Sequence, residues 1–539
     1  MNFFHTFYWS LLLYIIIHDN LYCKMLRLVN FNTMITIPEI IDFYNDDKIF
    51  ITTEHRLNFT FSDLKKQNQW TKNFLHNNYI QKNDIVAIVL ENGAEMATSF
   101  LSIASYCRSA PLNPTFTSSE FDFYLNDLNP KALIVMHDSK SPVIEVAKKK
   151  KIKIFRLLAN PSEPSGKFTL IFEDNDKSNS FYSKNEIIPN DIALILHTSG
   201  TTSRPKMVPL THLNLCTSAK NITHTLNLNR IDRCINIMPL FHIHGIVCLL
   251  LSTLSSGGSI FPSPGFDALK FFSWVKKFSP SWYSAVPTMH QAILMRADRN
   301  SEIIARSNLR FIRSSSASLP SKTMKDIEHI FHCPVIESYG MTEASHQMTS
   351  NHLPPGKRKP SKVGYAAGPE VEIMGDDKNI LEKGKIGEVV IRGDNVAKEY
   401  INNSQANKDS FIDGWFLTGD QGFFDEEGFL QLTGRLKEII NKGGEKISPL
   451  EIDEAVMEHQ SIFQCITFPI VHEKLGEEIA VAIVLKNNQQ LTDYELKKFL
   501  SKKLASFKIP KKIITLKEIP KGKTGKLQRI GLAKKLGLE

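Results

Sequence analysis

Small and hydroxyl-bearing side chains gather in one segment near residue 200. Residues 196–212 read LHTSGTTSRPKMVPLTH and follow an apolar run, Asp191–Leu196, that is typical of a buried strand. Such a loop can bring backbone N–H groups and hydroxyls close to phosphate oxygens, with a lysine as a cation. Its spacing does not fit a Walker A loop. The candidate phosphate-binding residues are Thr198, Ser199, Gly200, Thr201, Thr202 and Lys206.

A second segment, ESYGMTE, combines an aromatic ring, a hydroxyl and a carboxylate. Tyr339 could stack on a base, and the Thr342 hydroxyl could bond a phosphate. Glu343 is a hard oxygen ligand of the kind that Mg²⁺ prefers. Taken alone, the segment is equally typical of a helix start with a buried tyrosine. The neighbouring candidates for nucleotide contact are Glu337, Ser338 and Gly340.

Two later segments add polar groups between glycines. Residues 414–420 read GWFLTGD, and residues 433–446 read TGRLKEIINKGGEK. Asp420 suits a pair of ribose hydroxyls, and Arg435 offers a forked cation for a sugar or phosphate. Gly443 and Gly444, followed by Glu445, allow the backbone to approach a ligand closely. Individually each of these segments could be an ordinary turn.

The basic C-terminal end carries one lysine in a glycine loop. Residues 520–529 read PKGKTGKLQR, with Lys526 after Gly525. From Glu495 to Glu539 there are 14 Lys and Arg against three Glu, whereas the whole chain carries only +9. This end could bind nucleic acid, an anionic membrane or a polyphosphate, or it could be a solvated lysine-rich face. By itself Lys526 would be read as solvated.

The elements that must position these residues alternate between strands and helices. Ile85–Leu90, Ala132–Met136 and Leu309–Arg313 are strand candidates, and Glu95–Cys107 is an amphipathic helix candidate. This alternation predicts an α/β fold with helix-flanked, mostly parallel sheets. Turn punctuation around Lys383–Arg392 and Gly428–Leu432 predicts an additional β element late in the same domain. Residues 160–190 are polar and turn-rich, which indicates a surface excursion.

The pattern changes near residue 438. We expect a small α+β domain there, with a helix at Pro449–Glu458, a strand at Ala480–Leu485 and a Lys-rich helix at Tyr494–Ala505. The predicted organisation is therefore an N-terminal extension at 1–33, a large domain at 34–436 and a small domain at 437–539.

Composition places the chain among globular proteins. It has 539 residues, of which 42% are hydrophobic and 22% charged, which excludes a largely disordered or collagenous chain. The seven cysteines are scattered, with no pattern typical of zinc sites or disulfide frameworks. We therefore expect a reducing compartment, the cytoplasm, and a peroxisomal location is disfavoured because the chain ends in GLE rather than SKL.

The first 33 residues need a separate interpretation. Phe3–Ile17 is almost continuously apolar, but it is shorter than the ~20 residues that a membrane helix needs. No basic residue precedes it, as a signal peptide would require. An extension with a later start at Met25 or Met34, an interfacial anchor with weak membrane contact, and a folded part of the domain remain open. No segment predicts a transmembrane span.

The four motifs together resemble the adenylate-forming superfamily of acyl-CoA synthetases, luciferases and adenylation domains. They occur in family order, and the likeness runs from about Ile35 to near the C-terminus. Many family members have glycine where this chain has Ser203 and Met207, and PKGKTGK replaces the commoner PxTxSGK. We expect an active enzyme despite these departures.

The resemblance implies a two-step ligase that uses ATP, Mg²⁺ and coenzyme A. A carboxylic acid attacks the α-phosphorus of ATP, and a thiol then attacks the acyl-adenylate. It implies that Lys526 contacts the carboxylate and α-phosphate, with Thr342 also at the α-phosphate. Glu343 would hold the metal, and Asp420 and Arg435 would bind the ribose.

The resemblance also implies a movement between the two steps. The small domain would rotate about a hinge at Lys437. This rotation would withdraw Lys526 and bring Gly443, Gly444 and Glu445 to the thiol tunnel. One active site would then serve both reactions.

The acid is indicated by three further segments. These read PLFHIHG, RSSSASL and ASHQMTSN, at residues 239–245, 313–319 and 344–351. The resemblance implies that His242, Ser316 and His346 border the acyl pocket, and such polar groups suit a second carboxylate better than an acyl chain. The overall pattern resembles the oxalate–CoA ligases of plants and fungi.

Three alternatives remain open at this point. The chain could be a CoA ligase for a medium-chain fatty acid or another small carboxylic acid. It could also be a non-catalytic nucleotide-binding relative, against which the intact Lys526 and Glu343 argue. A nucleic-acid-binding role for the basic end is disfavoured, because the body has no recognisable nucleic-acid module.

Overall fold

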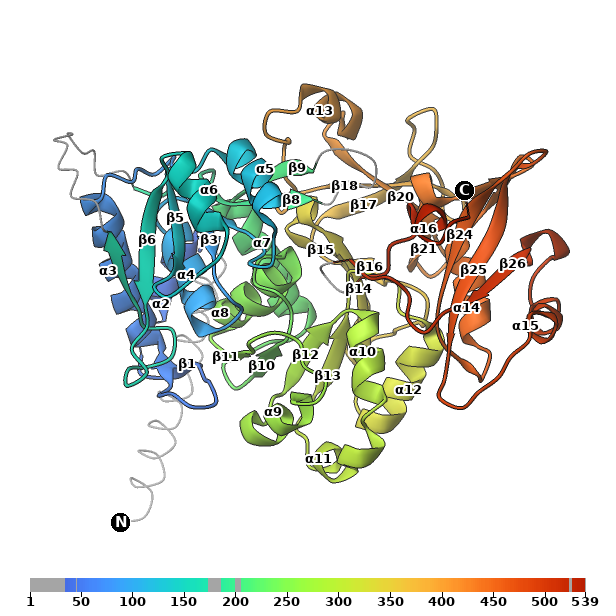
Figure 1. The fold of residues 1–539 in the computed structure, drawn as a ribbon, viewed down its shortest axis with the longest axis horizontal. Coiled ribbons are helices and arrows are strands. Elements are labelled where there is room, and N and C mark those ends of the chain that lie inside the picture. Colours follow the sequence, from blue (N-terminus) through green and yellow to red (C-terminus); the bar gives the residue numbers. More distant parts are fainter. Residues whose placement is uncertain (1–33, 45, 173–185, 199–204, 523–525, 539) are drawn as a thin grey trace, which may run out of the picture.

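The computed structural model describes residues 34–44, 46–172, 186–198, 205–522 and 526–538. These residues form four β-sheets with helices packed against them. In Figure 1 the seven-stranded sheet lies at one side, a nine-stranded sheet fills the middle and the C-terminal strands lie at the opposite side. The predicted α/β class, with parallel sheets followed by a smaller α+β part, is confirmed.

The seven-stranded sheet is parallel except at its edges. Its strand order is β7-β6-β5-β3-β4-β8-β9, and only the edge pairs β6–β7 and β8–β9 run antiparallel. The strands are β3 (Ile85–Val89), β4 (Arg108–Pro111), β5 (Ala132–Met136), β6 (Lys153–Leu158), β7 (Thr169–Phe172), β8 (Ile192–Thr198) and β9 (Lys206–Thr211). The helices along this part of the chain are α3 (Phe61–Asn77), α4 (Ala94–Ala104), α5 (Ser118–Leu128) and α6 (Val143–Lys149). The turn-rich 160–190 segment contributes edge strand β7, and its residues 173–185 lie outside the described part.

The nine-stranded sheet has a parallel centre and antiparallel ends. Its strand order is β16-β15-β14-β13-β12-β10-β11-β1-β2. The strands are β1 (Ile49–Ile51), β2 (Phe59–Thr60), β10 (Arg233–Asn236), β11 (Ser259–Pro262), β12 (Trp282–Ala285), β13 (Phe311–Ser314), β14 (Val335–Met341), β15 (His346–Ser350) and β16 (Tyr365–Ala366). The helices before and between them are α2 (Ile37–Phe43), α7 (His212–Thr225), η1 (His244–Leu251), α8 (Ser252–Ser256), α9 (Phe271–Phe278), α10 (Pro287–Leu294), η2 (Asp298–Asn300), α11 (Ser301–Ala305), α12 (Ser321–Phe331) and η3 (Thr342–Ala344).

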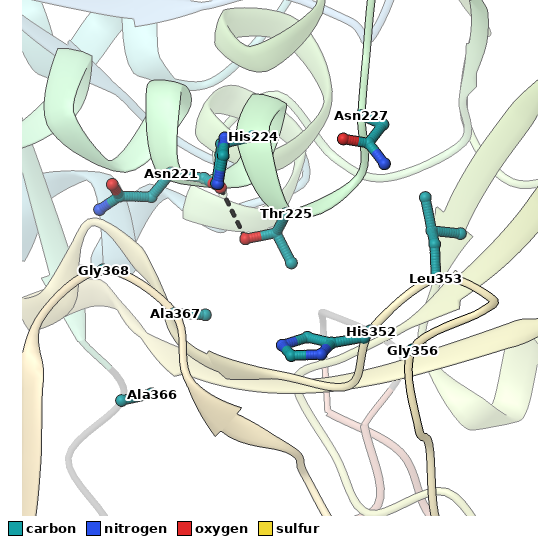
Figure 2. Close-up of a pocket in the computed structure, with 10 residues that line it drawn as sticks. All are labelled: Asn221, His224, Thr225, Asn227, His352, Leu353, Gly356, Ala366, Ala367 and Gly368. Carbon is teal, nitrogen blue, oxygen red and sulfur yellow. Dashed lines mark hydrogen bonds between the residues drawn. The ribbon is translucent and has the colours of Figure 1, made fainter.

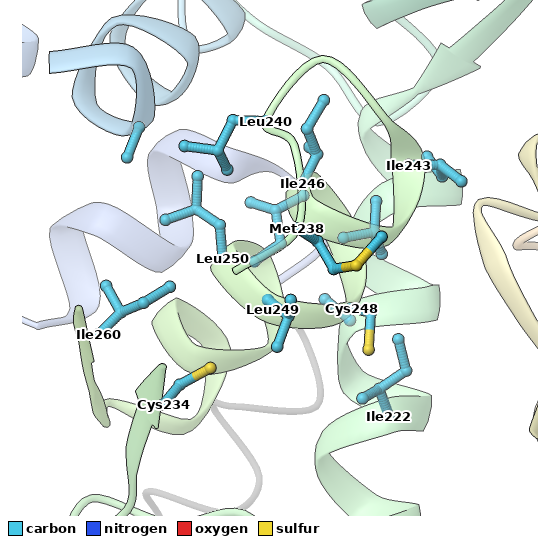
Figure 3. Packing of buried hydrophobic residues seen from close by; sticks show 14 of the residues in the cluster. Ile222, Cys234, Met238, Leu240, Ile243, Ile246, Cys248, Leu249, Leu250 and Ile260 are labelled. Atoms are coloured by element: carbon cyan, nitrogen blue, oxygen red, sulfur yellow. The ribbon is translucent and has the colours of Figure 1, made fainter. Parts of the chain in front are cut away.

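The helix η1 is a buried π-helix. All eight of its residues, HGIVCLLL, are buried. Figure 3 shows Ile246, Leu249 and Leu250 packed among apolar side chains from neighbouring elements. An extended π-helical stretch is rare and is found mostly near functional sites. Its apolar residues anchor it in the core, whereas His244 at its first position is polar.

A five-stranded antiparallel sheet follows, as the turn punctuation predicts. It contains β17 (Glu370–Met374), β18 (Gly387–Arg392), β19 (Phe411–Ile412), β20 (Trp415–Phe424) and β21 (Leu430–Arg435), with helix α13 (Ser404–Ser410) before β19. Residues 383–392 do not form a hairpin by themselves, because β18 pairs with β17 and β20 instead.

The C-terminal part of the chain builds its own sheet and cores. Its strands are β22 (Ile440–Lys442), β23 (Glu445–Ile447), β24 (Ile462–His472), β25 (Gly476–Leu485) and β26 (Lys512–Thr515). Its helical segments are η4 (Leu436–Glu438), α14 (Pro449–Met457), α15 (Asp493–Leu500), η5 (Ser506–Lys508) and α16 (Leu532–Lys535). The predicted Lys-rich helix is shorter than expected, because the chain turns after Leu500 although Leu504 still packs on the core.

Two separate apolar clusters lie within residues 440–538, apart from the main core. The division of the chain at residue 436 stays a prediction. Among the described helices, none has the length and apolarity to cross a bilayer. Residues 1–33 lie outside the described part, so the N-terminal alternatives stay open.

Candidate active site

The predicted ribose and adenine residues come together where three strands meet. Tyr339 lies on β14, Asp420 on β20 and Arg435 at the end of β21. The Tyr339 hydroxyl donates a hydrogen bond to Asp420, and Arg435 Nε lies 3.1 Å from Asp420 Oδ1. Because β20 and β21 are antiparallel and pair Asp420 with Arg435, the ion pair follows from the strand register. Burial raises the pKa of Asp420, and the Arg435 charge counteracts this rise.

The predicted metal ligand and phosphate-loop lysine share one neighbour. Tyr400 donates its hydroxyl to Glu343 Oε1 at 2.9 Å, and Lys206 Nζ lies 4.3 Å from the centre of the Tyr400 ring. Burial raises the pKa of Glu343, while the Tyr400 hydrogen bond and the charges of Arg435 and Lys206 lower it. Thr198 ends β8 opposite Lys206, but Ser199, Gly200, Thr201 and Thr202 lie outside the described residues.

Four other predicted nucleotide residues line up along β14 and into η3. Glu337 accepts a hydrogen bond from the Leu319 amide at 3.0 Å, and burial raises its pKa to about 8. The Ser338 hydroxyl donates to the Ser314 carbonyl at 3.3 Å. A Cβ at Gly340 would lie 1.5 Å from the carbonyl oxygen of His346, so this position requires glycine. Thr342 follows at the start of η3 and is half-buried.

The charge of Lys526 acts on two of the predicted acid contacts, His242 and His346. Burial, followed by the Arg435 charge, lowers the pKa of Lys526 to about 8. Burial, with the Lys526 charge, also lowers the pKa of His242 to about 3. The charge of Lys526 thus acts on a histidine that is far away in the sequence. Residues 523–525, which precede Lys526, lie outside the described part.

His244 is a candidate that the sequence interpretation missed. It is fully buried, and its Nε2 and Nδ1 lie 2.7 Å and 3.1 Å from the hydroxyls of Ser284 and Ser316. The ring centres of His244 and His346 are 4.9 Å apart, and neither nitrogen of His346 has a hydrogen-bond partner among the described residues. Burial lowers the pKa of both imidazoles well below their usual range. The PLFHIHG motif contains two histidines, so the second one was available as a signal.

The backbone is strained at this cluster. Ser316, Ser345 and His346 have φ angles of +73°, +49° and +95°. Non-glycine residues in this region are uncommon, and such strain concentrates at functional sites. The strained positions belong to two of the segments that indicate the acid.

Arg313 is the second candidate that was missed. It is fully buried on β13, beside Ser284 of β12. Its two terminal nitrogens donate to Cys248 Sγ at 3.0 Å and Gln347 Oε1 at 3.2 Å, and its Nε has no partner. No carboxylate of the described residues pairs with it. Sequence reasoning missed it, although Arg313 begins the RSSSASL segment, because a single arginine near the end of an apolar strand gives no signal of burial.

The predicted hinge and tunnel residues lie at the start of the C-terminal sheet. Lys437 is the middle residue of η4, directly after Arg435 and Leu436. Gly443 and Gly444 connect β22 to β23 with φ angles of +61° and +96°, as a two-residue hairpin turn requires. Glu445 begins β23 and is exposed. Their hinge and tunnel roles remain predictions.

A separate cavity lies behind the cluster. It has a volume of about 440 Å³, and Figure 2 shows Asn221, His224 and Thr225 of α7 facing the loop that carries His352. None of the predicted site residues lines it. Gln347 connects it to the cluster, because its Nε2 donates to Thr225 Oγ1 and to the Ala367 carbonyl, both in the cavity wall.

Comparison with known proteins identifies the family. The AMP-binding enzyme family matches residues 43–401, and the AMP-binding enzyme C-terminal domain matches residues 451–526. The oxalate–CoA ligase of Saccharomyces cerevisiae is 43% identical over 470 residues, which cover 83% of this chain and 86% of that protein. The oxalate–CoA ligase of Arabidopsis thaliana is 43% identical over 456 residues, which cover 84% and 88% of the two chains.

A solved structure shares the fold over nearly the whole chain. The crystal structure of ATP-bound MatB from Rhodopseudomonas palustris superimposes with a TM-score of 0.83 at 26% identity, covering 93% of this chain and 98% of that one. The family motifs, the converging site residues and these matches agree. This chain belongs to the family of AMP-binding enzymes.

Proposed function

We propose that this protein is an AMP-forming ligase that joins oxalate to coenzyme A. The name of its 43%-identical relatives from yeast and Arabidopsis supports the choice of acid. The observation that carries the proposal is the polar cluster of the buried His244 and His346 with the half-buried Ser316, on which the charge of Lys526 acts. A pocket for a fatty acyl chain would be lined by apolar groups, whereas a small anion needs donors when it is buried.

In the first step, a carboxylate oxygen of the acid attacks the α-phosphorus of ATP. The new P–O bond forms as the bond to the leaving pyrophosphate breaks. The ammonium group of Lys526 would neutralise charge that builds on the attacking carboxylate and the α-phosphate. Catalysis of this kind depends on positioning and charge more than on covalent help from the protein.

Nucleotide binding would use the residues at the strand ends. Asp420, held by Arg435 and by the Tyr339 hydroxyl, would accept hydrogen bonds from the ribose hydroxyls. Lys206 would contact the phosphates from β9. In the second step the CoA thiol, after losing its proton, attacks the acyl carbon and AMP leaves.

The buried carboxylate of Glu343 fits a magnesium ion, which would neutralise phosphate charge when bound. It is a hard oxygen ligand, and the Tyr400 hydroxyl donates a hydrogen bond to its side chain. Burial raises the pKa of Glu343, and the Tyr400 hydrogen bond and the Lys206 charge counteract this rise. A bound cation would favour the ionised carboxylate further.

Acid-dependent pyrophosphate release tests this proposal. The wild-type protein is assayed with ATP, Mg²⁺ and CoA on oxalate, malonate, acetate, octanoate and coumarate. We expect a preference for oxalate, and loss of at least ~100-fold in rate for Lys526→Ala, since this lysine contributes to charge stabilisation in the transition state. A preference for octanoate would show that oxalate is not the substrate. If the protein binds ATP but turns over none of these acids, the proposed ligase activity is wrong.

A further inference from the structure

An arginine buried without a carboxylate is energetically costly. Arg313 is fully buried, and its partners are a thiol and a neutral amide, which do not compensate its charge. Burying an unpaired ion costs several kcal/mol in order of magnitude. Burial lowers the pKa of Arg313, but a guanidinium in a protein keeps its proton at neutral pH and cannot escape the cost in this way. An anion from outside the chain would compensate this charge.

The surroundings of Arg313 favour an anion over a metal ion. His244, Cys248 and His346 have ligand atoms within 4.8 Å of one another, a grouping that could in principle hold a metal. However, Arg313 already bonds the Cys248 sulfur. The Arg313 and Lys526 charges both lower the pKa of His244 and His346, so each acts on the cluster with the same positive sign. A cation would be repelled here, whereas an anion would be attracted.

The guanidinium also connects the elements that carry the two imidazoles. Cys248 lies on η1 four residues after His244, and Gln347 follows His346 on β15. By donating to both, Arg313 bridges the π-helix to the strand. The buried Arg313 side chain therefore helps to hold the two imidazole rings, whose centres are 4.9 Å apart, in their relative positions.

We propose that Arg313 is a positioning residue that determines specificity: its fixed charge makes the cluster select a short dicarboxylic acid over a singly charged acid of the same shape. The proposal rests on the proposed function and deepens it. One carboxylate of the acid reacts near Lys526, while the other lies in the field of Arg313. The neutral imidazoles of His244 and His346 offer polar contacts, and the arginine supplies the charge.

The test compares oxalate with oxamate, which has the same shape but carries an amide in place of one carboxylate. The measured quantity is the ratio of kcat/KM for oxalate to kcat/KM for oxamate. We expect Arg313→Met to lower this ratio on the order of 30- to 100-fold, the size of one charge interaction at short range in a protein. The loss should fall in KM for oxalate, with KM for ATP changed less than about threefold.

Two matched variants separate charge from packing. Arg313→Lys keeps the charge and loses the forked geometry, so it should retain most of the selectivity. Arg310→Gln removes an arginine that is paired with Asp232 just before the same strand, and it should leave the ratio unchanged. An unchanged ratio in Arg313→Met, or an equal loss in Arg313→Lys, would overturn the proposal.

A second pair of variants tests the role of the Arg313 charge if Arg313→Met does not fold. Gln347→Glu places a carboxylate on the atom that already accepts from Arg313 at 3.2 Å, which cancels the charge in place. Gln347→Met loses the same donated bonds without adding charge. We expect selectivity to fall in the first and to persist in the second. Equal ratios in the two variants would contradict the role of charge.

The wild-type results distinguish this inference from the proposed function. If oxalate is used but its preference over oxamate survives in the charge-cancelling variants, the inference fails and the function stands. The protein could instead prefer another dicarboxylic acid over the monoamide of that acid, and this preference could depend on Arg313. In that case the inference about Arg313 is supported, and oxalate is not the substrate. If only monocarboxylic acids are used, both fail.

Discussion

At the scale of single residues, the site is marked by buried polar atoms that lack partners. His346, Arg313 Nε and Glu337 Oε2 are examples, and they belong to neighbouring segments of the nine-stranded sheet. Native structures satisfy the great majority of buried polar groups, so each exception needs an explanation. Under the proposed function, a bound nucleotide and an anionic acid would complete the missing contacts of this group.

The depressed pKa of Lys526 leads to a prediction about pH. With a pKa of about 8, the ammonium is present below pH 8 and is lost above it. Because the charged form serves the first step, kcat/KM for ATP in adenylate formation should decline about tenfold per pH unit well above pH 8. Oxalate-dependent exchange of pyrophosphate into ATP between pH 6.5 and 9.5 measures this decline.

Lys526→Arg is the control for that profile. Its guanidinium stays charged throughout the range, so the alkaline decline should disappear although the absolute rate falls on the order of tenfold or more through altered geometry. The same decline in this variant would assign the titration to another group.

At the scale of elements, histidine at the start of a helix joins two parts of the core. His212 is the first residue of α7, is almost fully buried, and its Nδ1 accepts a hydrogen bond from the Ile37 amide of α2 at 3.2 Å. The neutral ring is needed for this acceptance. Burial lowers its pKa to about 4. The contact between α2 and α7 therefore depends on pH.

Protonation of His212 should lower the free energy of unfolding at acidic pH. Its pKa in the fold, about 4, lies below the ~6.5 of an unfolded histidine, so the unfolded chain binds more protons between these values. Its contribution is fully present above pH 6.5 and is lost as pH falls. The stability advantage of wild type over His212→Gln should therefore shrink by roughly 1.4 kcal/mol per pH unit below pH 6.5.

Urea unfolding of both proteins at pH 7.5, 6.5 and 5.5 gives this difference directly. His137→Gln, at an exposed position, serves as the comparison and should follow wild type at each pH. A constant gap between wild type and His212→Gln would refute the assignment to this ring.

At the scale of the whole molecule, one carboxylate on α14 docks the C-terminal sheet onto the nine-stranded-sheet region. Glu454 accepts hydrogen bonds from the Ser321 amide at 3.0 Å and from the Ser361 hydroxyl at 3.0 Å. Gln464 also donates to Gln291 across this contact at 3.1 Å. In the same arrangement the charge of Lys526 acts on His242, and we propose that adenylate formation uses this arrangement.

Loss of the Glu454 contact should therefore affect one half-reaction. Removing hydrogen bonds worth about 1 kcal/mol each should slow adenylate formation roughly tenfold in Glu454→Ala. Consumption of the adenylate after CoA addition, which uses the rotated arrangement we propose, should change little. Single-turnover measurements of both steps test this. Glu451→Ala, which removes an ion pair to Lys508 within the C-terminal part, should leave both rates intact.

Much of the molecule was determined by local sequence. The runs Ile85–Leu90 and Ala132–Met136 form strands because short apolar runs rich in isoleucine and valine bury both faces of a parallel sheet. The order and spacing of the four motifs sufficed to identify the family. Helix starts were also encoded locally, since Thr36, Thr60 and Thr117 each form a capping box with an acid three residues later.

The acid cluster was decided only by the tertiary structure. His242 and Ser316 could be proposed from motifs, but the partners of Ser316 and Arg313 come from η1 and β15, far away in the chain. Local sequence cannot state whether an arginine is buried, or whether a carboxylate lies beside it. That depends on which distant elements pack together, and here β12, β13, β15 and η1 enclose one uncompensated charge.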